Sequence, residues 1–240
     1  MWPLDWLSLR LSPVYFGRGV PRGDGGPVVL VPGFMTTDAY LLEMYFWLQR
    51  VGYTPFLSSI GVNANCIRAL TNRLTKTVDR VYAETGRPIR IIGHSLGGSL
   101  ARRAALRRPD IIEQLISLGA PLQSLQAHPA LMAPAQWVGR RVKHAPPSRD
   151  ATRWLGNRLH HDCECLADHC VPIPPASVRR AALYTRNDGV IDWRNCLEPD
   201  PSLNHEVGGT HLGLAFNHRA YRVIAELLPQ TAAAALPKAA

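Results

Sequence analysis

A short segment near the middle of the 240-residue chain reads Ile89-Arg90-Ile91-Ile92-Gly93-His94-Ser95-Leu96-Gly97-Gly98. Its isoleucines indicate a buried β-strand, and residues 99–108 have the composition of a helix, which Pro109 ends. A serine in the pattern Gly-x-Ser-x-Gly, after a strand and before a helix, is typical of a nucleophile held at a sharp turn. The alternative is a glycine-rich turn that arises by chance, and it leaves the flanking strand and helix unexplained. We therefore expect Ser95 to act as a nucleophile.

The segments on both sides of this turn alternate between strand and helix. Runs rich in β-branched residues, or apolar residues three to four apart, predict strands at 27–31, 53–57, 89–92, 111–118, 181–185 and 204–207, and helices at 37–50, 65–85, 99–108 and 214–228. Pro55 makes the second strand irregular or places it at an edge. The alternation predicts an α/β fold with a mostly parallel sheet, flanked by helices and joined by right-handed crossovers.

Residues 121–178 interrupt this alternation. They contain eight prolines and little strand pattern, and they are too many for a plain connection. In sheets of this kind such an insertion lies over the carboxyl ends of the strands, where ligands bind. We expect a proline-rich cap or lid within one domain that spans residues 1–240, with a disordered alanine-rich tail at 230–240.

Composition and charge narrow the classes of function. With 46% hydrophobic and 19% charged residues the chain is globular, and its length suits a single core, which can grow to about 250 residues. The net charge of +9 attracts anions in general. Because no nucleic-acid recognition motif accompanies it, we expect a solvated basic face and no nucleic-acid partner. Attraction to an anionic lipid surface is the alternative.

The first residues, 2–16, are rich in tryptophan and leucine but also carry Asp5 and Arg10. They lack the order of regions that marks a signal peptide, and they are too short and too charged to span a bilayer. A cytoplasmic or peripheral location is therefore the default expectation, although the cluster of cysteines at 163–196 would suit an oxidising compartment. We expect the segment to cover an open sheet edge, with contact to a membrane interface as the alternative.

A serine nucleophile needs a base, and a carboxylate to orient that base, in the chain order serine, acid, histidine. His211 is the best placed histidine downstream, because it lies in the small-residue loop Gly208-Gly209-Thr210-His211-Leu212-Gly213 between the last predicted strand and the last predicted helix. His205 falls in that strand and His218 inside that helix. We expect His211 to be the base. The alternative is a surface histidine in a glycine loop.

Asp188 is the preferred acid. It follows a predicted strand in the turn Arg186-Asn187-Asp188-Gly189, where a carboxylate at the strand's carboxyl end can reach the histidine. Asp192, four residues later, is the alternative. Either aspartate can instead serve only to cap a turn.

Two backbone N–H groups are expected to stabilise an oxyanion. One belongs to Leu96, at the positive end of the helix that follows the nucleophile. The other comes from the loop after the strand at 27–31, which reads Pro32-Gly33-Phe34-Met35. Phe34 is the first choice and Met35 the second, and both side chains either line an apolar acyl pocket or belong to the core.

Taken together, these motifs resemble the bacterial triacylglycerol lipase and esterase branch of the α/β hydrolases, over residues 28–228. The segments that carry the resemblance are Val31-Pro32-Gly33-Phe34, Gly93-His94-Ser95-Leu96-Gly97-Gly98, Leu118-Gly119-Ala120-Pro121, Asp188-Gly189-Val190 and His211-Leu212-Gly213-Leu214.

This resemblance implies that Ser95, Asp188 and His211 form a catalytic triad with oxyanion donors from Phe34 and Leu96. It also implies hydrolysis of esters with lipid-like acyl chains, without a metal or a cofactor. The chain departs from the pattern at position 32, where many such lipases have histidine. It also lacks strands before residue 27, which makes it a trimmed version of the fold.

The cysteines form a cluster of their own. Cys163, Cys165 and Cys170 lie in the insertion and Cys196 follows the turn of Asp188. The spacing C-x-C-x4-C differs from that of common zinc sites, so we expect disulfides that tie the cap to the loop after Asp188, with a structural metal as the alternative. Cys66 is expected to be a buried free thiol.

The sequence thus predicts a monomeric carboxylic-ester hydrolase, an esterase or lipase, that acts on a small ester or lipid. An acyltransferase or an amidase would use the same three residues and differ only in the bond cleaved or in the acyl acceptor. A non-catalytic module that binds a lipid or a protein is a further alternative. Serine, aspartate and histidine in the expected order argue against it.

Overall fold

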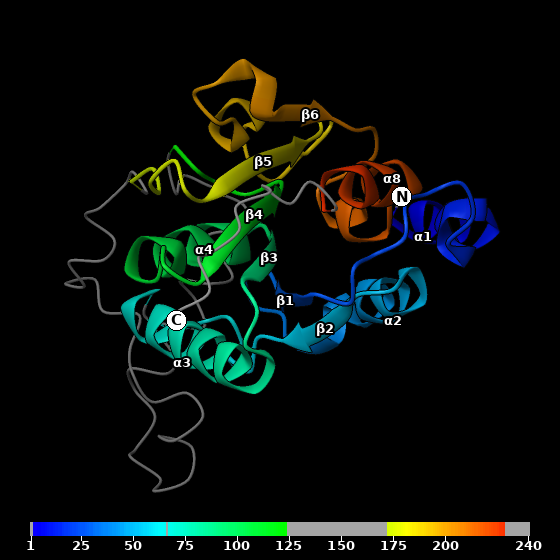
Figure 1. The fold of residues 1–240 in the computed structure, drawn as a ribbon. Helices are drawn as coiled ribbons and strands as arrows, with labels where there is room; N and C mark the ends of the chain where they lie inside the picture. The colour runs from blue at the N-terminus through cyan, green and yellow to red at the C-terminus, as the bar shows by residue number, and fades with distance from the viewer. Residues whose placement is uncertain (1, 66, 124–171, 229–240) are drawn as a thin grey trace, which may run out of the picture.

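The computed structural model describes residues 2–65, 67–123 and 172–228. Its centre is a parallel sheet in the order β2-β1-β3-β4-β5-β6 (Figure 1). The strands are β1 (Pro27–Val31), β2 (Thr54–Leu57), β3 (Ile89–His94), β4 (Ile112–Leu118), β5 (Arg179–Tyr184) and β6 (Asn204–Glu206). The predicted parallel α/β sheet is confirmed, and so is the edge position of β2. The sheet has no described strand before β1, as expected for a trimmed fold.

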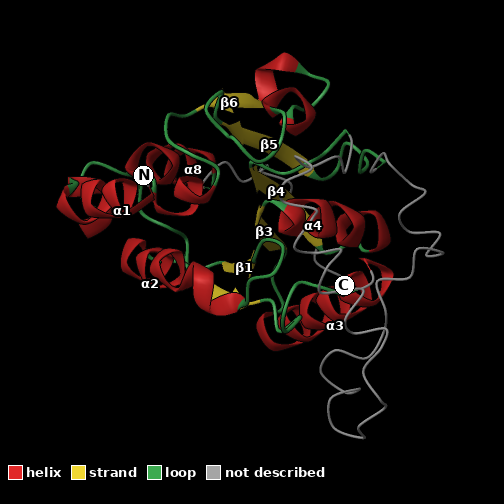
Figure 2. Ribbon diagram, turned by 180° about the vertical axis from the view of Figure 1, so that it is seen from behind, coloured by secondary structure: helices red, strands yellow, loops and turns green. Residues whose placement is uncertain are grey.

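Helices cover both faces of this sheet (Figure 2). The α-helices are α1 (Trp2–Leu11), α2 (Leu42–Val51), α3 (Ile67–Thr85), α4 (Leu96–Arg107) and α8 (His218–Leu227). Single 3₁₀ turns are η1 (Pro13–Phe16), η2 (Asp38–Leu41), η3 (Trp193–Cys196), η4 (Pro201–Leu203) and η5 (Leu212–Phe216). Helices α3 and α4 cover one face, and α2 and α8 cover the other.

The apolar run in β1 reflects burial on both faces. Val28 and Leu30 pack in the cluster formed with α2 and α8, whereas Val29 and Val31 pack against α3 and α4. Because alternate side chains of a strand point to opposite faces, a strand between two helical layers has no polar side.

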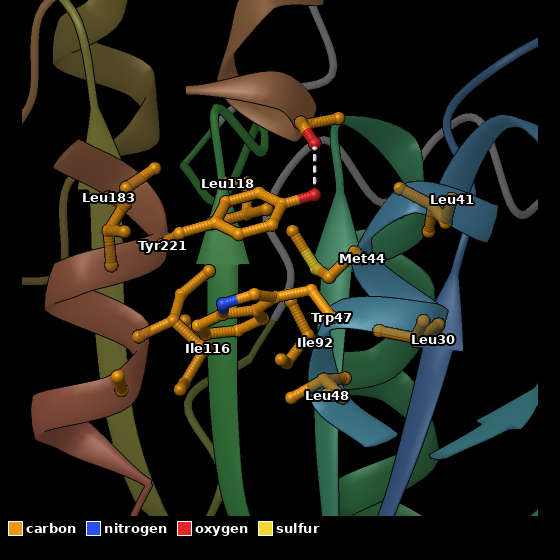
Figure 3. Packing of buried hydrophobic residues seen from close by; sticks show 14 of the residues in the cluster. Leu30, Leu41, Met44, Trp47, Leu48, Ile92, Ile116, Leu118, Leu183 and Tyr221 are labelled. Carbon is orange, nitrogen blue, oxygen red and sulfur yellow. Dashed lines mark hydrogen bonds between the residues drawn. The ribbon is translucent and has the colours of Figure 1, made fainter. Parts of the chain in front are cut away.

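The core on the α2 and α8 face is built around two large rings (Figure 3). The centroids of the Trp47 and Tyr221 rings lie 4.6 Å apart. Trp47 Nε1 donates to the carbonyl of Val14 at 2.9 Å, and the Tyr221 hydroxyl donates to the carbonyl of Ala215 at 3.0 Å. Since the polar atom of each ring has a partner, both rings can be fully buried.

Three predicted helix boundaries are wrong. The helix expected at 37–50 opens with η2 before α2 begins, and the helix expected at 99–108 begins three residues earlier, at Leu96. The helix expected at 214–228 is split at Asn217, whose side chain caps α8 by accepting from the N–H groups of Arg219 and Ala220. His218 is therefore the first residue of α8.

The N-terminal segment does not cover a sheet edge, and that prediction is wrong. Helix α1 packs against η5 and α8, outside the sheet (Figure 1). The reason lies in its side chains, since Leu9 is fully buried in the core and Arg10 pairs with Glu43 of α2. Leu4 and Leu11 stay largely exposed, so contact with a membrane interface remains a prediction.

The expectations for most of the cap and for the tail fall on residues 124–171 and 229–240, which lie outside the described residues. Among the helices of the described ranges, none combines the length and the apolar character needed to cross a bilayer.

Candidate active site

Ser95 occupies the sharp turn between β3 and α4. Its φ of 53° and ψ of −128° lie outside the regions that a serine ordinarily adopts. Two backbone hydrogen bonds hold this conformation, one from Ser95 N–H to the carbonyl of Leu118 at 2.8 Å and one from Gly98 N–H to the carbonyl of Ser95 at 2.9 Å. The turn therefore holds the serine at the carboxyl end of β3, as predicted.

Glycines allow this turn to pack against its surroundings. A Cβ atom on Gly97 would lie 2.3 Å from the carbonyl oxygen of Val31, and one on Gly93 would lie 2.6 Å from that of Gly97. The start of α4 thus packs directly on the end of β1. The sequence prediction placed these residues in a turn because they belong to the Gly-x-Ser-x-Gly pattern, whereas the structure places Gly97 in the first turn of α4, where the close packing on β1 requires glycine.

His211 links the serine to the acid. Its Nε2 lies 2.9 Å from Ser95 Oγ, and its Nδ1 lies 2.7 Å from Asp188 Oδ2. Because a carboxylate can only accept, Nδ1 carries the proton and Nε2 is free to accept the proton of the serine hydroxyl. All three side chains are buried.

The carboxylate of Asp188 is fixed on its other side as well. Its Oδ1 accepts from the backbone N–H groups of Val190 and Ile191, at 3.0 and 2.7 Å. The N–H of His211 also donates to the carbonyl of Asp188 at 3.2 Å. The aspartate therefore has little freedom to turn away from the imidazole.

Gly119 is a residue whose role the sequence did not reveal. It follows β4 with a φ of 55°, and a Cβ atom there would lie 3.2 Å from His211 Nδ1 and 3.3 Å from Asp188 Oδ2. A side chain at this position would therefore press on the bond between acid and base. Its place directly after a predicted strand was the available signal.

The alternative acid and bases have other partners. Asp192 caps η3 by accepting from Arg194 N–H, and it pairs with the guanidinium of Arg194. His218 Nδ1 lies 3.1 Å from Ser8 Oγ, and His205 lies on the edge strand β6. None of these side chains takes part in the hydrogen-bonded chain of Ser95 and His211.

The loop after β1 supplies the candidate oxyanion donor. Met35 N–H donates to the carbonyl of Asn63 at 2.9 Å, so the second choice of donor is already engaged. Among the backbone hydrogen bonds of the described residues, none uses Phe34 N–H. Leu96 is the first residue of α4, where N–H groups have no acceptor within the helix. Within the part of the chain that the structure describes, neither first choice therefore has a backbone acceptor.

Asn63 braces this loop, a role that the sequence did not indicate. Its side chain Nδ2 donates to the carbonyl of Pro32 at 2.7 Å and its N–H donates to the carbonyl of Thr36 at 2.9 Å. Phe34 is half-buried and Met35 is about half exposed. Neither side chain belongs to the core, which leaves both able to contact a substrate.

The expected disulfides between the cap and the loop after Asp188 remain a prediction, because their cap cysteines lie outside the described residues. Among the described residues, Cys196 is a buried free thiol whose Sγ donates to the carbonyl of Asp192, and burial raises the pKa of this thiol far above its usual range. The expectations for residues 66, 163, 165 and 170 lie outside the described residues. Within the described residues, histidine, cysteine and acidic side chains form no group of three or more that fits a metal ion.

No protein-family profile matches the chain. Among solved structures, the mature lipase BlEst2 of Bacillus licheniformis superposes with a TM-score of 0.61 at 15% identity, over 88% of this chain and 94% of that one. The carboxylesterase CesB of Bacillus subtilis gives 0.55 at 14% identity, over 88% and 87%. A monoacylglycerol lipase of Paleococcus ferrophilus gives 0.52 at 20% identity, over 87% and 96%. With its parallel sheet and its serine turn after β3, the chain has the α/β-hydrolase fold that these lipases and esterases share.

Proposed function

We propose that this protein is a carboxylic-ester hydrolase that works through an acyl-enzyme on Ser95. The observation that carries the proposal is the continuous hydrogen-bonded chain from Asp188 through His211 to Ser95, at the carboxyl end of β3. It lies where the strand order changes direction, between β1 and β3, which is the usual binding position in an open α/β sheet.

In the first half of the reaction, Ser95 Oγ attacks the ester carbonyl carbon while its proton passes to His211 Nε2. Asp188 accepts from Nδ1–H throughout and stabilises the imidazolium that forms. The tetrahedral intermediate collapses, the bond to the alcohol oxygen breaks, and the imidazolium gives its proton to the departing alcohol. The acyl group remains on Ser95.

In the second half, water takes the place of the alcohol. His211 removes a proton from the water as it attacks the acyl carbon, and the same proton returns to Ser95 Oγ when the acid leaves. In both halves we assign the N–H groups of Phe34 and Leu96 to the negative oxygen. The closeness of α4 to the end of β1 supports this pairing.

The structural neighbours support an ester as the substrate, because they are named as lipases and a carboxylesterase. Apolar groups near the site support a lipid-like acyl chain. Met35 and Leu212, which directly follow the proposed donor Phe34 and the proposed base His211, are each about half exposed.

A panel of p-nitrophenyl esters, from acetate to laurate, tests the activity and the acyl preference together. We expect hydrolysis of at least one ester by the wild type, and a kcat on the order of 10⁶-fold lower in Ser95→Ala. Ser99→Ala is the matched control, since Ser99 lies four residues later, in α4, and donates to the carbonyl of Pro121. Failure to hydrolyse any ester, or equal rates in Ser95→Ala, would contradict the proposal.

An acyltransferase would share every step except the last. Adding a primary alcohol to the same assay separates the two activities, because transfer yields a new ester in place of the free acid. We expect the free acid to dominate. A product that is mainly the new ester would assign the deacylation step to an alcohol.

A further inference from the structure

Two side chains hold the backbone of the loop that carries His211. His94 Nε2 lies 3.0 Å from the carbonyl oxygen of His211, and the hydroxyl of Tyr40 donates to the carbonyl oxygen of Leu212 at 2.7 Å. A carbonyl oxygen can only accept, so His94 Nε2 carries the proton. Two successive carbonyls of this loop are thus bound by donors from the serine turn and from η2.

His94 is held as a neutral donor. Its side chain is 2% exposed, and burial, assisted by the neighbouring His211, lowers the pKa of His94 to about 3. The two histidine rings lie 5.1 Å apart between centroids. Since His211 must become an imidazolium during acylation, a second cation at this distance would oppose that step. A donor without charge avoids this repulsion.

The position of His94 also explains a glycine. A Cβ atom on Gly33 would lie 2.9 Å from His94 Nδ1 and 3.2 Å from Ser95 Cβ. His94 therefore packs between the loop of the proposed oxyanion donor and the loop of the proposed base. Its Nδ1 is buried and has no hydrogen-bond partner within the described residues. Among these residues, the ring therefore forms its hydrogen bond through Nε2, to the loop of the proposed base.

Tyr40 completes the arrangement. Its ring lies 5.2 Å from that of His94 and packs edge-on against Phe216 at 5.3 Å, between centroids. Contacts on two sides fix the direction of its hydroxyl. The hydroxyl is thus directed at the carbonyl oxygen of Leu212.

We propose that His94 and Tyr40 are positioning residues that clamp the His211 loop and thereby set His211 Nε2 at hydrogen-bond distance from Ser95 Oγ. The inference deepens the proposed function and rests on it. Both residues act through the backbone of the base, and neither is assigned a contact with substrate. A misplacement of about 1 Å at a reacting group can cost about a hundredfold in rate, so loss of the clamp should lower kcat more than it changes KM.

The variants separate the donor from the ring. His94→Phe keeps an aromatic ring and removes the donor, His94→Gln restores a neutral N–H, and Tyr40→Phe removes only the hydroxyl. Tyr82→Phe, on the exposed side of α3, and His205→Phe, on the edge strand β6, are the matched controls. Urea unfolding of each variant reports whether it remains folded at the assay temperature.

Kinetics and proton NMR are then measured on the same samples. We expect His94→Phe to lower kcat about tenfold to a hundredfold with KM within about twofold. Removing one neutral hydrogen bond in Tyr40→Phe should cost about fivefold. His94→Gln should recover most of the loss. The downfield resonance of the His211 Nδ1 proton, which is bonded to Asp188, should shift or broaden in His94→Phe and return in His94→Gln.

The clamp is overturned if His94→Phe keeps the wild-type kcat and the wild-type resonance, or if His94→Gln is impaired as strongly as His94→Phe. A loss explained entirely by the unfolded fraction also overturns it. The resonance requires no turnover. If the wild type hydrolyses no ester, the proposed function fails, while the response of the His211 proton to the two His94 variants still decides whether the clamp exists.

Discussion

Replacing Gly97 by alanine should separate the two backbone segments that provide the proposed oxyanion donors, the loop after β1 and the start of α4. The new Cβ would lie 2.3 Å from the carbonyl oxygen of Val31 and 2.6 Å from that of Pro32, and both contacts are with backbone. An ordinary carbon contact is about 3.5 Å, so α4 and the end of β1 must separate by about 1 Å. That displacement predicts a loss of about a hundredfold in kcat/KM for ester hydrolysis.

The same variant should remain folded, which makes the kinetic result interpretable. Overpacking costs about 1–3 kcal/mol, and replacing glycine by alanine within a helix returns about 1 kcal/mol. The net loss is small beside the stability of a typical domain, about 5–15 kcal/mol. Urea unfolding measures it directly.

Gly208→Ala is the matched control, because a methyl group there would contact only the flexible guanidinium of Arg219, at 3.4 Å. Initial rates with p-nitrophenyl butyrate compare the two variants with wild type. The reasoning is refuted if Gly97→Ala keeps its kcat/KM within about threefold of wild type, since a separation of the donors by about 1 Å should cost about a hundredfold.

Three further changes have distinct outcomes. Asp188→Asn should lower kcat by about 10⁴-fold, because an amide favours the wrong tautomer of the base; stopped assays at high enzyme concentration measure the residual rate. Asp24→Asn should lower the Tm at neutral pH, since the hydrogen bond from Arg90 holds the pKa of Asp24 well below its usual range. Because the pKa of Asp24 is lower in the folded than in the unfolded state, its ionised carboxylate stabilises the fold above about pH 4, and this stabilisation is lost as the pH falls below that value. The difference in Tm between wild type and Asp24→Asn should therefore shrink in acid, as measured by circular dichroism. Glu198→Gln should destabilise the fold by about 3 kcal/mol in urea unfolding, because the buried carboxylate pairs with Arg102 at 2.7 Å.

For each of these three substitutions, a control variant or a second condition gives a result that would contradict the prediction. Asp192→Asn should leave kcat nearly unchanged, and a larger loss there than in Asp188→Asn would assign the acid to Asp192. Glu206→Gln, in an exposed pair with Arg186, should cost no more than about 1 kcal/mol. Equal losses in the free energy of unfolding for Glu198→Gln and Glu206→Gln would show that burial does not increase the cost of breaking the ion pair. A Tm difference for Asp24→Asn that persists unchanged in strong acid would contradict the role assigned to its charge.

The strands and the serine turn were predictable because local sequence determines them. A strand buried on both faces appears in the sequence as a continuous run of β-branched residues, as in β1. A strand that ends in Gly-x-Ser-x-Gly predicts a sharp turn into a helix, with the serine in the turn. Helix ends were harder to predict. Gly97 and Gly98 resemble turn residues until the contacts with β1 and Ala120 are known, and Asn217 stops a helix whose apolar periodicity continues on both sides.

Contacts between segments far apart in the chain were not predictable. The bond from His94 to the carbonyl of His211 joins residues 117 positions apart, and the bracing of the donor loop by Asn63 depends on how two loops pack. The placement of α1 against η5 was also missed, because a segment rich in tryptophan and leucine can cover any of several apolar surfaces. Ser95, Asp188 and His211 were predicted from their local motifs and from their order in the chain. The structure brings them within hydrogen-bond distance, and their catalytic roles remain a prediction.

The most direct test of the central claim is covalent labelling with a fluorophosphonate, followed by mass spectrometry. The account predicts one adduct on wild-type protein, located on the peptide that contains Ser95, no adduct in Ser95→Ala, and much slower labelling in His211→Ala. Wild-type protein that takes up no label, or an adduct that forms equally in Ser95→Ala, would contradict it.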